Sequence, residues 1–169
     1  MAIIINWVEQ QKQSESCIEI PMFKGSFVIH FIDNVITKTE WRLQPLDTRL
    51  VINNQWQEIQ GYLNNPEKSL TVNLKLQGSD YRHKVWAEMC KIPVGKTLSY
   101  SALASKIDSG ARAVANACRD NPFPGIIPCH RVVAVSGLGG YMGQTSGECL
   151  DLKRMLLALE QKLLAMNGF

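Results

Sequence analysis

The chain lacks the features that mark several classes of protein. Among its 169 residues, no apolar run approaches the ~20 residues that a membrane-spanning helix needs. The apolar stretch 2–5 ends at Asn6, with no basic segment before it and no cleavage site after it, which predicts a strand rather than a signal peptide. There is also no basic tract that would serve as a nuclear address. We therefore expect a cytoplasmic protein without membrane contacts.

Cysteine and histidine are sparse and irregularly spaced. The five cysteines are odd in number and include no Cys-x-x-Cys pair, and the chain has only three histidines. These counts argue against a disulfide framework and against a closed zinc site. Each thiol must then be explained by packing or by chemistry.

The balance of charge differs between the two halves. Apolar residues make up 46% of the chain and charged residues 20%, so a core can be buried. The net charge is +3, and residues 79–169 carry 11 Lys and Arg against 7 Asp and Glu. The positive surplus therefore lies in the second half. It allows a surface that faces phosphates, although a solvated face can carry the same charge.

The hydrophobic pattern changes near residue 78. Strand patterns occupy 3–7, 17–20, 27–32 with 35–37 as a hairpin, and 71–76, and a short helix follows Trp56. We expect this first part to be a scaffold. From Ser79 the pattern is helical, with Tyr81, Val85 and Met89 on one face. A helix capped by Ser99, a turn at 108–110 and a third helix at 111–119 predict a helix-turn-helix.

The third predicted helix has two distinct faces. Ala111, Val114 and Cys118 form an apolar stripe, and the opposite side carries Arg112, Asn116 and Arg119. Ala113, Ala115 and Ala117 lie between the two faces and keep the helix thin. Such a helix can approach a phosphate backbone or a narrow groove closely. The alternative is that the alanines only favour helix and the arginines are solvated.

The segment 122–133 has a composition unlike that of an ordinary loop. Three prolines and a glycine make it rigid, and Cys129 is followed directly by His130 and Arg131. A base and a cation beside a thiol are surroundings that stabilise a thiolate. The alternative is that Cys129 is a buried small apolar residue, as most free cysteines are.

The sequence PCHRVV at 128–133 resembles the active-site signature of the O6-alkylguanine-DNA alkyltransferases, the methylated-DNA–protein-cysteine methyltransferases. The resemblance covers roughly the second half of the chain, in which further motifs match in order and spacing: VW at 85–86, IPVGK at 92–96, SYSALA at 99–104, ARAV at 111–114 and NP at 121–122. It implies an α+β fold, with a small ribonuclease-H-like α/β domain at 1–78. A mainly helical, winged helix-turn-helix-like domain for DNA binding and alkyl transfer would occupy 79–169.

The resemblance also implies roles for individual residues. Cys129 would accept the alkyl group, His130 would be its water-bridged base and Glu160 would orient His130. Tyr100 would help to extrude the damaged nucleotide and protonate the leaving guanine. Other roles follow from the same match: Arg112 as the finger that fills the vacated stack, Asn121 as the brace beneath the cysteine, and Val132 and Tyr141 as lining of the guanine pocket. The predicted pocket also includes Tyr100 and Met142. The thin face of the third helix adds Ala113, Ala115, Asn116 and Arg119 as further predicted DNA-binding residues.

Two of these roles have support from the residues themselves. Glu160 is flanked at three and four residues by leucines on both sides, and a buried carboxylate without a partner is costly. The alternative is that Glu160 lies at the edge of the apolar face and reaches water. The side chains of Cys129 and His130 diverge because the two residues are adjacent, so a bridging water is easier to build than a direct contact.

One segment departs from the family pattern. The loop between Tyr141 and Lys153 is several residues longer than usual in the family, and Met142 stands where a small residue is common. We expect Cys149 in this loop to be exposed and incidental. The longer loop leaves the tolerance of bulky alkyl groups open.

The function that the resemblance implies is DNA repair. A monomer would take the alkyl group from O6 of guanine, and from O4 of thymine, in double-stranded DNA bound through the minor groove. No metal or organic cofactor is needed for this displacement, and the damaged nucleotide must leave the duplex first. Two alternatives are a lesion-binding module without transfer, against which Cys129 itself argues, and a cysteine hydrolase with a Cys-His-Glu triad, for which no acyl pocket is evident.

Overall fold

The structure is a computed structural model that describes residues 2–9, 14–44 and 56–166. The chain divides into two compact units, Met1–Gln77 and Gly78–Phe169. This division lies one residue before the expected boundary, and the roles assigned to the two parts remain predictions. Within the described ranges, no helix combines the length and apolar character that a membrane crossing requires.

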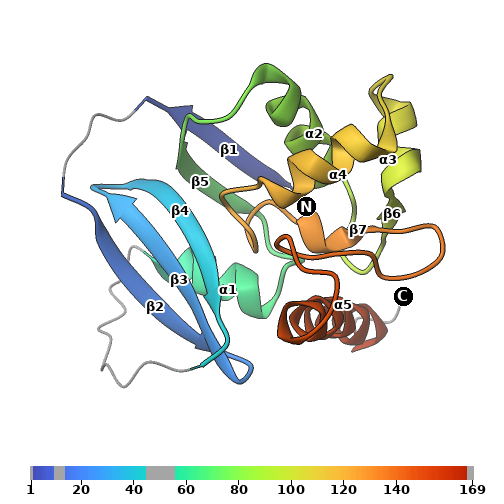
Figure 1. Cartoon of the computed structure of the whole chain (residues 1–169). Helices are drawn as coiled ribbons and strands as arrows, with labels where there is room; N and C mark the ends of the chain where they lie inside the picture. The colour runs from blue at the N-terminus through green and yellow to red at the C-terminus, as the bar shows by residue number, and fades with distance from the viewer. Residues whose placement is uncertain (1, 10–13, 45–55, 167–169) are drawn as a thin grey trace. The chain divides into compact units, whose positions relative to one another are not determined.

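The first unit is built on a five-stranded mixed sheet (Figure 1). Its strands are β1 (Ile3–Val8), β2 (Ser16–Met22), β3 (Gly25–Ile32), β4 (Val35–Arg42) and β5 (Leu70–Lys75), in the spatial order β1-β5-β4-β3-β2. Strands β2, β3 and β4 are antiparallel and joined by short turns, of which the second contains Asp33 at a φ of +53°. Strand β5 runs parallel to both β1 and β4.

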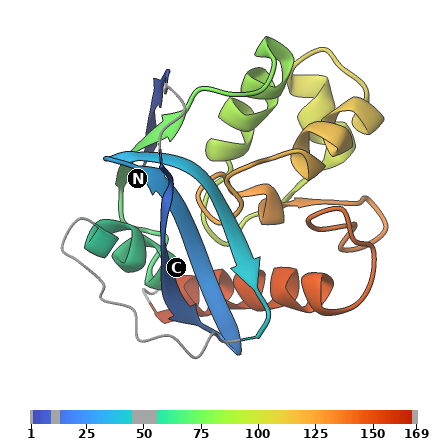
Figure 2. The same ribbon diagram turned by 60° about the vertical axis from the view of Figure 1, so that its left-hand side comes forward.

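Helix α1 (Gln57–Asn64) precedes β5 and lies beside it (Figure 2). Parallel neighbours need a crossover connection, and α1 belongs to the segment that connects β4 to β5. The helix buries Ile59, Tyr62 and Leu63 at helical spacing. The core of this unit also contains Phe27 and Ile29 of β3, which are fully buried.

The second unit is mainly helical. It contains α2 (Asp80–Cys90), α3 (Tyr100–Lys106), α4 (Ala111–Arg119) and α5 (Glu148–Met166), together with a 3-10 turn, η2 (Cys129–Arg131). Two short parallel strands, β6 (Leu98–Ser99) and β7 (Val132–Val133), pair with each other. Helices α2, α3 and α4 pack on one another, and η2 contacts both α2 and α5.

Local sequence signals account for where these helices begin. Ser79 accepts a hydrogen bond from the Arg82 backbone N–H at 3.3 Å, and Ser99 accepts one from the Ala102 N–H at 3.1 Å. Both are serine N-caps of the expected kind. Helix α4 has the predicted bounds and follows α3 after a turn in which Asp108 has a φ of +53°.

Two predicted faces need correction. Val85 and Met89 are fully buried, but Tyr81 is 36% exposed, because its hydroxyl hydrogen-bonds Ser109 at the surface. On α4, Ala111 is exposed at the first turn, and Ala117 is buried together with Val114 and Cys118. The α+β class is confirmed, whereas the finer likeness of the first unit to ribonuclease H remains a prediction.

Candidate active site

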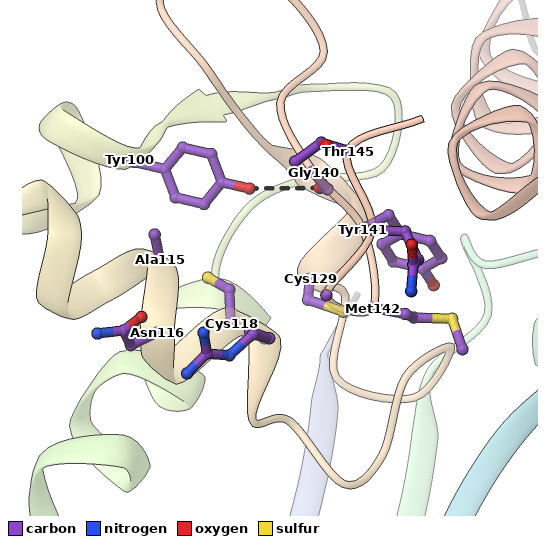
Figure 3. Close-up of a pocket in the computed structure, with 12 residues that line it drawn as sticks. Tyr100, Ala115, Asn116, Cys118, Cys129, Gly140, Tyr141, Met142 and Thr145 are labelled. Carbon is purple, nitrogen blue, oxygen red and sulfur yellow. Dashed lines mark hydrogen bonds between the residues drawn. The ribbon is translucent and has the colours of Figure 1, made fainter. Parts of the chain in front are cut away.

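A cavity of about 300 Å³ lies in the second unit, and Cys129 lines it (Figure 3). Helices α3 and α4, the 3-10 turn η2 and the loop that precedes α5 all contribute to its wall. The lining residues are Tyr100, Ala115, Asn116, Cys118, Arg119, Cys129, Gly140, Tyr141, Met142, Gly143, Gln144 and Thr145. Residues of helices α3 and α4, of η2 and of the loop at 140–145 therefore meet around a cavity that two thiols, Cys118 and Cys129, line.

Tyr100 begins α3 and lines the cavity. Its hydroxyl donates a hydrogen bond to the Gly140 carbonyl at 3.4 Å (Figure 3). Gly139 lies directly behind the ring, with a φ of +71°, and a Cβ there would come within 3.0 Å of the ring. Burial raises the pKa of Tyr100 to about 12, so the phenol keeps its proton at neutral pH.

Asn121 braces the rigid segment that leads to Cys129. Its Nδ2 donates to the Ile127 carbonyl at 3.1 Å, and its Oδ1 accepts from the Phe123 N–H at 2.9 Å. The Cys129 N–H in turn donates to the Ile127 carbonyl at 2.8 Å. The predicted position of Asn121 beneath the cysteine agrees with these contacts, and Cys129 is only 6% exposed.

His130 and Glu160 form a buried pair at 2.8 Å, between His130 Nε2 and Glu160 Oε1. Their exposed fractions are 3% and 2%, so Glu160 does not reach water at the edge of its helix. Burial lowers the pKa of His130, whereas hydrogen bonds and charge from His130 and Arg131 outweigh burial and lower the pKa of Glu160 to about 2. The pair is therefore a neutral imidazole and a carboxylate.

The charge on Glu160 fixes which nitrogen of His130 carries the proton. An ionised carboxylate only accepts hydrogen bonds, so Nε2 must be the N–H and Nδ1 must carry the lone pair. Nδ1 is buried and has no hydrogen-bond partner among the described residues. A buried nitrogen with a free lone pair can take a proton from a neighbouring thiol or water.

Arg131 does not serve as a cation for the thiol, contrary to the expectation from its place in the sequence. Its Nε and Nη2 donate to Glu160 at 2.9–3.1 Å, and its Nη1 donates to the Ile92 carbonyl at 2.8 Å. The side chain is buried and turned toward α5. Consecutive residues of η2 point in different directions, so adjacency to Cys129 does not bring the guanidinium to Sγ.

The surroundings of Cys129 also differ from those expected. Burial raises the pKa of the Cys129 thiol, and hydrogen bonds with Asn121 and Tyr141 and the charge of Lys153 act in the opposite direction. The raised pKa favours the protonated thiol of Cys129. A thiolate stabilised by both neighbours stays a prediction, to which Arg131, bound to Glu160, adds no support.

Lys153 is a residue of the site that sequence reasoning missed. It is fully buried, and its Nζ donates to the carbonyls of Val132, Leu138 and Gly140 at 2.6, 2.8 and 2.9 Å. Burial lowers its pKa to about 8. Lys153 lies seven residues before Glu160 on α5, so the argument that identified Glu160 on an apolar face applies to Lys153 as well.

The predicted DNA-facing residues lie on the exposed side of α4. Arg112, Ala113, Asn116 and Arg119 are exposed, and Ala115 lines the cavity. Asn116 and Arg119 also line it, so one helix face continues from the surface to the thiol. Arg119 Nε lies 3.3 Å from the Asp120 carboxylate, a partner that the sequence reasoning did not consider.

The rim of the cavity is a tight turn in the long loop. Tyr141 and Gln144 exchange backbone hydrogen bonds of 2.8 and 2.9 Å, and between them Met142 and Gly143 have φ of +51° and +79°. Two successive positive φ angles between hydrogen-bonded residues define a type I′ turn. Methionine is unusual at such a position. Tyr141 and Met142 thus line the cavity, and their contact with guanine stays a prediction.

Two other predictions in this region need correction. The side chain of Val132 is fully buried and is not among the residues that line the cavity. Cys149 is partly buried rather than exposed, since it lies in the first turn of α5. Cys118 lines the cavity although it was expected only to pack against other helices.

The matches to known proteins include this same part of the chain. Residues 80–162 match the family model described as 6-O-methylguanine DNA methyltransferase, DNA binding domain. The chain is 35% identical over 104 residues to the methylated-DNA–protein-cysteine methyltransferase of Archaeoglobus fulgidus, and this match covers 61% of the chain and 71% of that protein. The chain belongs to the methylated-DNA–protein-cysteine methyltransferase family.

Other members of the family show how far the likeness extends. The Methanosarcina mazei methyltransferase is 38% identical over 107 residues, which cover 62% of this chain and 65% of that protein. The chain spans between 53% and 65% of the length of five curated members. Its structure is similar to that of the Mycobacterium tuberculosis O6-methylguanine methyltransferase, with a TM-score of 0.71, 28% identity, and coverage of 92% of this chain and 100% of that one.

A second solved structure shows the Mycobacterium tuberculosis protein in complex with DNA. It matches with a TM-score of 0.67 and 28% identity, over 87% of this chain and 93% of that one. Family membership therefore rests on sequence matches that cover 61–62% of the chain and on structural likeness that reaches 92% of it. Within the described residues, no group of three or more His, Cys, Asp or Glu side chains is arranged to hold a metal ion.

Proposed function

We propose that the chain is a DNA repair protein that transfers an alkyl group from O6 of guanine to Sγ of Cys129. The observation that carries this proposal is a cavity lined by Cys129, with the neutral His130 and the ionised Glu160 in the adjoining core. The substrate would be O6-alkylguanine in double-stranded DNA, and the activity that of a methylated-DNA–protein-cysteine methyltransferase. The relatives carry this activity in their names.

The displacement uses groups that the site already holds. Cys129 passes its proton, through one water, to Nδ1 of His130, while Glu160 stays ionised and holds Nε2–H. Sulfur then attacks the alkyl carbon, the carbon–oxygen bond breaks, and its electron pair stays on guanine. Tyr100 supplies a proton to the leaving base and is reprotonated from the imidazolium. No electrons are gained or lost overall.

The target atom must reach a thiol that is almost fully buried. Cys129 is 6% exposed, and a cavity of about 300 Å³ is at the lower end of small-molecule sites. A paired base cannot enter it, so the damaged nucleotide rotates out of the duplex. The thin face of α4 would approach DNA from the minor groove, with Arg112 filling the vacated stack, and the same cavity would take O4-alkylthymine.

The product explains why the protein would act once. An S-alkyl thioether has no electrophilic carbonyl for water to attack, so His130 cannot assist a second step. Each chain, acting as a monomer in the cytoplasm, would therefore accept a single alkyl group. The two alternative functions differ on this point: a lesion-binding module transfers nothing, and a cysteine hydrolase regenerates its thiol.

Incubation with duplex DNA that contains one O6-methylguanine, followed by intact-protein mass spectrometry, separates the three functions. The proposal expects the mass of one methyl group on the protein and loss of the lesion from the DNA. Cys129→Ser should bind the duplex and gain no mass, whereas Cys149→Ser, the matched control, should behave as the wild type. An unmodified wild-type protein, with the lesion either intact or removed, contradicts the proposal.

A further inference from the structure

We propose that Arg131 is a positioning residue that keeps His130 in the neutral tautomer with its lone pair on Nδ1. The basis of this inference is the set of buried hydrogen bonds that Arg131 makes. Its consequence for alkyl transfer rests on the proposed function. Three donor–acceptor contacts join Arg131 to Glu160, and a fourth holds it to the Ile92 carbonyl. The carboxylate that His130 needs is therefore shared with a guanidinium.

The geometry leaves Glu160 no freedom to turn or to take a proton. Its Oε1 accepts from His130 at 2.8 Å and from Arg131 at 2.9 Å, and its Oε2 accepts from the Gly95 N–H at 2.9 Å. A planar guanidinium binds a carboxylate in a fixed orientation that an ammonium does not reproduce. Arg131 thus fixes the acceptor, and the fixed acceptor selects the protonated nitrogen of His130.

The charges around His130 give the direction of the effect. Glu160 and Lys153 of α5 and the neighbouring Arg131 of η2 are the charged groups that act on His130. Cys90 of α2 is close enough to Arg131 to feel its charge. Glu160 favours the imidazolium, whereas Arg131 and Lys153 disfavour it. Removing the guanidinium therefore leaves His130 as the only side chain paired with Glu160 among the described residues, beside the Gly95 N–H, so that His130 holds a second proton up to higher pH. In that form Nδ1 donates and cannot act as a base.

The test compares Arg131→Met and Arg131→Lys with a matched control on α5. Arg154 pairs with Asp151 at 2.7 Å on the surface, so Arg154→Met removes an arginine–carboxylate pair that is not buried. For each folded variant, two quantities are measured: the 15N shifts of the two His130 nitrogens across pH, and the pH dependence of methyl transfer from duplex DNA. The first readout needs no activity.

In Arg131→Met we expect imidazolium signals to persist to higher pH, and the acid limb of the transfer rate to move up by about one pH unit or more. Arg131→Lys should shift both readouts less than Arg131→Met does, because it keeps the positive charge. Arg154→Met should leave both readouts unchanged. A melting temperature that falls in Arg131→Met with an unaltered tautomer and pH profile would show a purely structural role and overturn the inference. If the wild type transfers no methyl group, the proposed function fails, whereas the His130 shifts still decide the role of Arg131.

Discussion

At the scale of single residues, Glu160 joins the chemistry of the site to its stability. The carboxylate is 2% exposed and takes part in five hydrogen-bond contacts: one with His130, one with the Gly95 N–H and three with Arg131. Its pKa of about 2 lies below the ordinary value of ~4.3. A depressed carboxyl pKa stabilises the fold fully above about pH 4.3, and this contribution is lost as pH falls toward 2.

Neutralising Glu160 should therefore destabilise the protein strongly. In Glu160→Gln, Arg131 stays buried without its anion, which typically costs about 3–5 kcal/mol. Asp151→Asn, which removes an exposed ion pair of the same helix, should cost no more than about 1 kcal/mol. Urea unfolding at pH 7 measures both changes. Equal, small losses in the two variants would refute the role of Glu160 as the anchor of a buried charge cluster.

Lys153 is the cation whose charge lowers the pKa of Cys129, against the effect of burial. In Lys153→Met, the reactivity of Cys129 with iodoacetamide should therefore need a higher pH than in the wild type. Lys162→Met changes an exposed lysine on the same helix and serves as the control. Because the chain has five thiols, the alkylated residue is identified by peptide mass mapping. A pH profile of Cys129 that is the same in all three proteins would contradict this role.

At the scale of elements, α4 connects the surface to the cavity. Its exposed side carries Arg112, Asn116 and Arg119, and its inner side buries Val114, Ala117 and Cys118. The bounds and the polar face of α4 could be predicted from the sequence, because capping, proline and helical spacing are local signals. The partners of Arg119 and Arg131 could not, because they lie on side chains whose direction depends on packing.

Arg112→Ala should separate duplex repair from chemistry. If Arg112 fills the space left by the extruded nucleotide, its loss should slow methyl transfer from duplex DNA by about tenfold or more. Transfer from free O6-benzylguanine needs no extrusion and should keep its wild-type rate. Arg154→Ala, at an exposed arginine away from α4, is the control for charge. Equal slowing on both substrates would show that Arg112 acts on the cavity and not on the DNA.

Asp120 ends α4 and places a carboxylate beside the proposed DNA surface. It pairs with Arg82 at 2.5 Å and with Arg119 at 3.3 Å, and both arginines lower its pKa against the effect of burial. Asp120→Asn should free Arg119 for a phosphate and tighten duplex binding a few-fold at low salt. The gain should shrink as salt rises, since the added contact is electrostatic. Weaker binding in Asp120→Asn would mean that the carboxylate orients Arg119 for DNA.

At the scale of the whole molecule, the lining of the cavity, its buried charge pair and the exposed face of α4 all belong to the second unit. The division near residue 78 could be predicted from the change of hydrophobic period. The site residues Cys129, His130, Tyr100 and Asn121 could be predicted from motifs. Lys153 and the true partner of Arg131 required the three-dimensional contacts between η2, β7 and α5. The type I′ turn at Met142 had no signal, since methionine rarely takes a positive φ.

The most direct test of the account is a titration of lesion against protein. Increasing amounts of duplex carrying one O6-methylguanine are added to a fixed amount of the wild type, and the modified cysteine is located by peptide mass mapping. The account predicts a plateau at one methyl group per chain, carried by Cys129 and absent from Cys118 and Cys149. Repair that continues past one lesion per chain, or a methyl group on another cysteine, would contradict the assignment of Cys129 as a single-use acceptor.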